Sequence, residues 1–109
     1  MPATTVVAAP KFAPIAVSAS GAATVVAAVA ERKIRVLAVA LVALAAVNVK
    51  FQSHVVPTDL SGLFYPAANG GFVLPYSPVG WLETIAGEAL DLNLSGNVAV
   101  GGVLVYLEV

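Results

Sequence analysis

The chain contains one histidine, His54, and it is the first residue to consider for chemistry. An imidazole can transfer protons or bind a metal ion. A catalytic triad or a histidine-rich metal site needs further partners, which one histidine cannot provide within one chain. His54 precedes Val55-Val56-Pro57 at the end of a predicted strand, where a loop histidine is the simpler interpretation. A threefold assembly would bring three copies around an axis, but nothing in the sequence requires one.

Three carboxylates, Glu83, Glu88 and Asp91, lie close together in the sequence. Glycosidases hold two carboxylates about 5–9.5 Å apart in a cleft, and Glu83 and Asp91 would suit this role if they lay on neighbouring strands. No polar or aromatic platform for a sugar surrounds them, so solvated strand faces and turns are the simpler interpretation. A calcium loop would show a spaced Asp/Asn run, and no such run is found here.

Two glycine pairs, Gly70-Gly71 and Gly101-Gly102, lack the flanking residues of a phosphate-binding loop. We therefore expect turns or bulges at both positions.

Five aromatic residues gather in the proline-rich middle of the chain. They are Phe64, Tyr65, Phe72, Tyr76 and Trp81. They form either an aromatic binding platform or, more simply, a packed loop layer or a subunit contact.

The composition indicates that this small protein hides apolar surface against a partner. Of the 109 residues, 60% are hydrophobic and 10% are charged, against roughly 25% charged in an average soluble domain. A domain of this size leaves much of its surface outside its own core. The covering partner is lipid, another protein or further copies of the chain.

Charge and cysteine content exclude several classes of function. The net charge is −1, and only Arg32, Lys33 and Arg35 cluster, which argues against a nucleic-acid partner. The absence of cysteine excludes disulfides, thiolate catalysis and thiol-bound zinc.

The apolar stretch from Arg35 to Ser53 decides the fold class. Its uninterrupted part, Val36–Val47, is shorter than the roughly 17–20 residues of a spanning helix. Extending it to Ala22–Ala30 would place Glu31, Arg32, Lys33 and Arg35 inside the bilayer. We therefore expect no membrane span.

A helix stays an alternative for this stretch, because alanine and leucine are good helix formers. The segment Val47–Gln52 alternates between apolar and polar residues, as a half-buried strand does. Ile34–Val42 is apolar at nearly every position, which is typical of a strand covered on both faces. We favour two strands, with a turn or bulge at Ala43–Ala46.

Further short strands are predicted between turn residues. In the predicted strand Ala89–Leu94, the side chains of Leu90, Leu92 and Leu94 should point to the same face. The segments are Thr24–Val29, Phe72–Leu74, Trp81–Thr84, Ala89–Leu94, Val98–Val100 and Val103–Val109, with weaker candidates at Thr5–Val7 and Ile15–Ser18. The glycines at 101–102 should break the last two, and the final strand should lock the C-terminus into a sheet. This pattern predicts an all-β fold, a single antiparallel β-sandwich or barrel.

The chain divides into an N-terminal arm or edge segment, residues 1–20, and a sandwich domain, residues 21–109. The arm has no positively charged start, and Pro10 and Pro14 interrupt its apolar pieces, so it makes a poor signal peptide. Such an arm can add a strand to the sheet edge of a neighbouring subunit.

Several segments of the chain resemble small proteins encoded among the virion genes of tailed phages and prophages. They are Asn48–Ser53, Ala68–Pro75, Gly80–Thr84, Ala86–Leu90, Asn93–Ser95 and Val100–Gly102. The resemblance covers roughly residues 21–109, and its motifs are turns and strand starts.

The resemblance implies a jelly-roll-like sandwich that forms a homotrimer on the virion surface. The implied role is that of a non-enzymatic capsid cement (decoration) protein, with the major capsid protein as its partner. It transfers no catalytic, cofactor-binding or metal-binding residue, and it implies no cofactor, nucleic acid, membrane or small-molecule substrate.

Two other functions stay open. A phage fibre or tail component that binds a glycan or receptor would need an exposed pocket around Tyr76 or Trp81. A small hydrolase would need Glu83 and Asp91 together in a deep acidic cleft.

Overall fold

The computed structural model describes residues 9–55 and 57–109, and this part of the chain forms strands and loops without a helix. The strands are β1 (Lys11–Val17), β2 (Gly21–Val26), β3 (Ile34–Ala43), β4 (Val49–Ser53), β5 (Thr58–Asp59), β6 (Gly71–Leu74), β7 (Leu82–Glu83), β8 (Leu90–Leu94) and β9 (Val100–Glu108). The predicted all-β class is confirmed, and the helix alternative for residues 35–53 is wrong.

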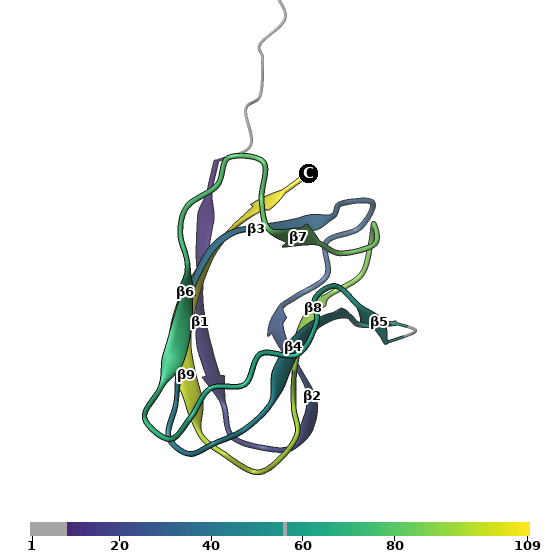
Figure 1. Cartoon of the computed structure of the whole chain (residues 1–109). Helices are drawn as coiled ribbons and strands as arrows, with labels where there is room; N and C mark the ends of the chain where they lie inside the picture. Colours follow the sequence, from purple (N-terminus) through teal and green to yellow (C-terminus); the bar gives the residue numbers. More distant parts are fainter. Residues whose placement is uncertain (1–8, 56) are drawn as a thin grey trace, which may run out of the picture.

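The strands form two antiparallel sheets that pack against each other (Figure 1). Sheet A has the order β1-β9-β3-β6, with β7 also paired to β3, and sheet B has the order β2-β8-β4-β5. The chain changes sheet after β1, β2, β3, β5, β7 and β8. This is the strand order of a jelly roll, with β7 as a short addition.

The core lies between the sheets and follows the period of two along each strand. On β8, Leu90, Leu92 and Leu94 are buried and face sheet A, as predicted. Phe51 of β4 and Leu104 of β9 are fully buried in the same cluster.

The apolar stretch that decided the fold class forms β3 and β4. The register shifts between Val36 and Ala38, so that Val36 and the intervening Leu37 are both buried. The chain leaves β3 after Ala43 and starts β4 at Val49, which confirms two strands with a turn between them. The second strand starts later than the predicted Val47.

The N-terminal segment joins the sandwich earlier than the expected boundary at Gly21. Its strand β1 lies at the edge of sheet A and pairs with β9, while Ile15 and Val17 contribute to the core. Pro14 cannot donate a ladder hydrogen bond, and an edge strand tolerates this. The sandwich therefore includes residues from Lys11 onward. The weak candidate Thr5–Val7 lies outside the described residues.

The break predicted at Gly101-Gly102 is wrong, because β9 runs through both glycines. A Cβ atom on Gly102 would lie 2.0 Å from the carbonyl oxygen of Ala40 on β3, so only glycine allows this approach of the two backbones. Beyond β9, the amide of Val109 donates to the carbonyl of Lys33 at 2.9 Å, and the amide of Lys33 donates back at 2.7 Å. The C-terminus is therefore held by the sheet, as expected.

Candidate functional site

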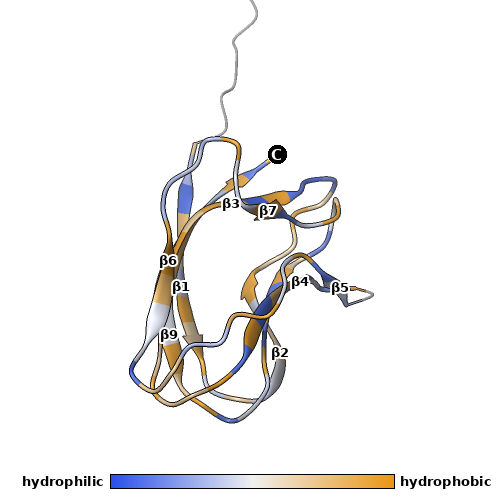
Figure 2. Ribbon diagram, in the orientation of Figure 1, coloured by the Kyte–Doolittle hydropathy of each residue, from blue (hydrophilic) through white to orange (hydrophobic). Residues whose placement is uncertain are grey.

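Much of the outward side of sheet A is apolar, and the charged Arg35–Glu83 pair lies at its β7 end. On β3 the buried Val39 and Leu41 alternate with the outward Ala40 and Val42. The paired strands continue this surface, which we call the apolar face: Phe12, Pro14, Ala16, Ala38, Ala40, Val42, Gly71, Val73, Gly101, Val103 and Val105. Hydrophobic colour runs along β6, β9 and much of β1 in Figure 2, whereas β4 and β5 include hydrophilic segments.

Large side chains of the apolar face are open to solvent in the isolated chain. The exposed fractions are 76% for Phe12, 68% for Val73, 54% for Val42 and 45% for Val103. None of the residues of the apolar face is charged. Contiguous apolar patches on soluble proteins mark interaction surfaces, so this face is the main candidate for a functional site.

The apolar face is uneven, because Val42 stands between two glycines. Its cross-strand neighbours are Gly71 on β6 and Gly101 on β9. With no side chain on either side, Val42 projects above the sheet and hollows form beside it.

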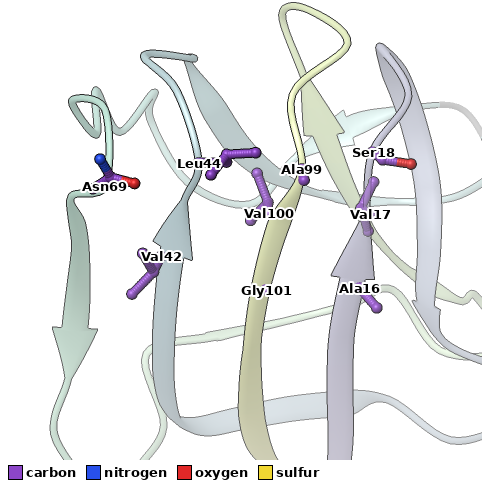
Figure 3. Close-up of a pocket in the computed structure, with 9 residues that line it drawn as sticks. All are labelled: Ala16, Val17, Ser18, Val42, Leu44, Asn69, Ala99, Val100 and Gly101. Carbon is purple, nitrogen blue, oxygen red and sulfur yellow. The ribbon is translucent and has the colours of Figure 1, made fainter.

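The first hollow, the end hollow, lies where β1, β3 and β9 reach the end of the sheet, with a volume of about 590 Å³. Figure 3 shows Val17 and Val42 from strands β1 and β3 around it, together with Leu44 and Ala99 from the adjoining loops.

The second hollow, the glycine hollow, has a volume of about 430 Å³ and lies over β6, β3 and β9. Gly71, Gly101 and Gly102 form its floor, and Val73 and Val103 lie at its sides.

His54 forms a close polar contact that the sequence did not predict. Its Nδ1 lies 2.6 Å from Oδ2 of Asp91, a carboxylate that is almost fully buried. The hydroxyl of Thr24 donates to the other oxygen of Asp91 at 2.9 Å. The two hydrogen bonds join Asp91 on β8 to Thr24 on β2 and to His54, which directly follows β4. The arrangement orients the imidazole.

Further side-chain hydrogen bonds lie beside this pair on the outward side of sheet B. The amide of Asn93 donates to Gln52 at 3.0 Å, and Gln52 donates to Asp59 at 2.8 Å. The hydrogen bond from Gln52, together with the ammonium of Lys50, lowers the pKa of Asp59. The outward side of sheet B is therefore polar, unlike that of sheet A.

The structure does not bring Glu83 and Asp91 onto neighbouring strands. Glu83 lies on β7 in sheet A, where the guanidinium of Arg35 contacts it at 2.9 Å and Lys33 at 3.4 Å. The hydrogen bond from Arg35 lowers the pKa of Glu83, and Lys33 adds to the effect. Asp91 lies on β8 in sheet B.

The third carboxylate, Glu88, anchors a loop. It accepts hydrogen bonds from the hydroxyl of the buried Ser53 at 2.7 Å and from the amide of Val55 at 3.2 Å. The three carboxylates therefore have different partners and do not form the acidic pair that a small hydrolase would need.

The five aromatic residues do not form one platform. Phe64 and Phe72 stack with ring centroids 4.2 Å apart and pack against the core. Tyr65 is exposed on another loop. Trp81 donates its indole N–H to the carbonyl of Pro75 at 2.7 Å, and Tyr76 is exposed on the same β6–β7 connection.

The glycine pair at 70–71 ends a turn and starts β6, as expected. Among the described side chains, no three histidine, cysteine, aspartate or glutamate residues gather as a metal site would require. The same part of the chain contains no helix able to cross a membrane.

The sequence predicted β3 as a strand with apolar residues on both faces, but it did not reveal the extent of the apolar face. Phe12, Val73 and Val103 come from separate strands, and only the sheet order places them together. The signal available was the run Val103–Val105, in which both faces are apolar. No protein-family model, curated protein or solved structure matches the chain.

Proposed function

We propose that the protein is a non-enzymatic structural protein of a virion, a capsid cement protein that binds the outer capsid surface as a homotrimer. The observation that carries this proposal is the uncharged apolar face of sheet A. The resemblance of the turn and strand segments to phage virion proteins supplies the location, on the capsid surface.

The apolar face supports a role in assembly because its exposure costs free energy in a lone subunit. Burying a side chain the size of valine or phenylalanine contributes roughly 1.5–3 kcal/mol. Phe12, Val42, Val73 and Val103 are between 45% and 76% exposed. Their burial therefore contributes roughly 4–7 kcal/mol per subunit.

The apolar face accounts for the subunit contacts, and the polar side of sheet B is available for another contact. A cement trimer stabilises the capsid because it binds the assembled shell and not its separated subunits. The major capsid protein is the partner in this proposal.

The test combines the native mass of the purified chain with negative-stain imaging of particles that carry a gold-labelled copy. We expect a trimeric mass and label spread over the capsid shell. Label confined to the tail tip, or a monomer that does not bind capsids, would contradict the proposal.

A glycan- or receptor-binding fibre component is a second candidate, favoured by the β6–β7 connection. Tyr76 and Trp81 are both exposed there, and aromatic rings can stack on apolar ligand surfaces. A glycan array would decide: binding lost in Trp81→Ala and Tyr76→Ala supports this candidate, and no binding rejects it.

A further inference from the structure

We propose that Phe12 of one subunit inserts into the glycine hollow on the apolar face of the next subunit, so that copies join head to tail in a closed ring. This inference rests on the trimer in the proposed function and specifies the contact that builds it. Two features support it: the projecting phenyl ring of Phe12 and the glycine hollow, which lie on the same uncharged surface.

Phe12 is the projecting group. It lies on the edge strand β1, opposite Val105 of β9, and its ring points away from the core with 76% of its surface exposed. Its neighbour on the same side of β1, Pro14, adds apolar surface without a polar group. An aromatic side chain this exposed is typical of an interface anchor.

The glycine hollow is the receiving site. Gly71 and Gly102 are required by the backbone, because a Cβ atom on them would lie 1.7 Å from the carbonyl oxygen of Leu41 and 2.0 Å from that of Ala40. Gly101 is different: its added Cβ would meet nothing closer than the carbonyl oxygen of Ile15 at 3.8 Å. The fold therefore tolerates a side chain at Gly101, yet none of the described side chains fills this space.

The hollow is large enough for a phenyl ring. Its volume is about 430 Å³, whereas an apolar protein cavity of about 150 Å³ accepts benzene. Val73 and Val103 offer apolar sides to the phenyl ring, and none of the described residues that line the hollow is charged. A charged or strongly polar occupant would lose its hydration there without gaining a partner.

The positions of the two features favour a head-to-tail contact. Phe12 lies on β1 at one edge of sheet A, and the glycine hollow lies over β6, β3 and β9 toward the opposite edge. Because the projection and the hollow lie on different parts of the subunit, each copy can bind two neighbours. Such head-to-tail contacts close into a ring when the rotation from one subunit to the next is a whole fraction of a turn. Three copies would turn their apolar faces toward a common axis.

The extent of the apolar face fits such a ring. Four strands about 4.8 Å apart and rows spanning about 20 Å along the strands give a projected area of about 400 Å². This is within the size of functional apolar patches.

The experiment compares assembly of the full chain and three variants by native mass spectrometry and analytical ultracentrifugation. Phe12→Ala removes the projection, and Gly101→Leu fills the hollow. Tyr65→Ala is the matched control, because Tyr65 is a 71% exposed aromatic residue outside the apolar face. We expect about a 30-fold or greater weakening of trimerisation for the first two variants and no change for the control.

Mixing the variants provides a second test. A Gly101→Leu subunit keeps its projection and a Phe12→Ala subunit keeps its hollow, so the mixture should form one-to-one heterodimers. Circular dichroism and the milder Gly101→Ala variant check that the subunits remain folded. Trimers of unchanged stability in both Phe12→Ala and Gly101→Leu would overturn the contact, as would the absence of heterodimers from folded variants.

The two proposals fail in different ways. If both variants remain trimeric and bind capsids, the contact is wrong while the cement function stands. If the wild-type chain forms the predicted ring but never binds capsids, the contact stands and the cement function is wrong. A face-to-face dimer of the wild-type chain would overturn the ring.

Discussion

The imidazole of His54 and the buried carboxylate of Asp91 lie 2.6 Å apart, Nδ1 to Oδ2, although 37 positions separate them in the sequence. Thr24 donates to the same carboxylate. The contact joins the end of β4 to β8 and the edge strand β2, so it ties together three strands of sheet B.

We expect Asp91→Ala to destabilise the protein by about 1–3 kcal/mol, because Thr24 and His54 lose their buried partner. His54→Ala should cost less than half as much, since the imidazole is largely exposed. Urea unfolding monitored by circular dichroism measures both variants. Equal losses would show that the two side chains depend on each other more strongly than their burial suggests.

The lowered pKa of Glu83 predicts a loss of stability in acid. The folded pKa lies below the ordinary glutamate value of about 4.3. The carboxylate therefore contributes stability above that value and loses it as the pH falls through the folded pKa. Glu83→Gln should lower the free energy of unfolding at pH 6 and have less effect at pH 3.

The partner Arg35 supplies the control for this experiment. In an Arg35→Gln background, which lacks the guanidinium that lowers the pKa most, the effect of Glu83→Gln should shrink at both pH values. An unchanged effect would assign the acid sensitivity to another carboxylate.

Three glycine-to-alanine variants should differ in stability according to how close the added Cβ atom lies to the neighbouring backbone. Gly71→Ala and Gly102→Ala bring a Cβ atom within 2.0 Å of a carbonyl oxygen on β3, and the strand must shift at a cost of about 1–3 kcal/mol or more. Gly101→Ala meets no such contact and should change stability by about 0.5 kcal/mol or less. Differential scanning calorimetry should place the first two well below the wild-type Tm.

A comparable melting temperature for all three variants would contradict this prediction, since it would show that the strands next to β3 can move away from it without loss of stability. The prediction is sharp because Gly101 and Gly102 are adjacent in the sequence and lie in the same strand.

Thr84 should matter for stability through one hydrogen bond. Its buried hydroxyl accepts from the amide of Ile34 at the start of β3, at 2.9 Å. Thr84→Val keeps the shape but leaves that amide without the hydroxyl, for a loss of about 1–3 kcal/mol. Thr84→Ser retains the acceptor and is the matched control, and chemical unfolding compares the two.

The fold class could be predicted because local patterns specify it. The alternation Leu90, Leu92, Leu94 and the apolar run Ile34–Val42 each reflect a strand environment, and turn residues separate them. The extent of β9 could not be predicted from Gly101-Gly102. The pair looks like a break locally, whereas the close approach of β3 is what requires Gly102.

The candidate site was harder to predict because it depends on pairing between distant segments. Phe12 and Val105 are cross-strand neighbours, as are Val73 and Ala40, and no spacing in the sequence reveals these pairs. The contact between His54 and Asp91 is also set by the sheet. Composition indicated that apolar surface was left over, and only the sheet order located it.

The pairing of β1 with β9 also affects how the protein is made. Lys11 lies opposite Tyr106, so the first strand of the sandwich has its ladder partner in the last. A ribosome adding about 5–20 residues per second leaves β1 without that partner for on the order of 5–20 s. During this interval Phe12 and Ile15 are apolar groups on an unpaired edge, in a crowded cell where other nascent copies are being made. Sheet A can close only after β9 has been synthesised.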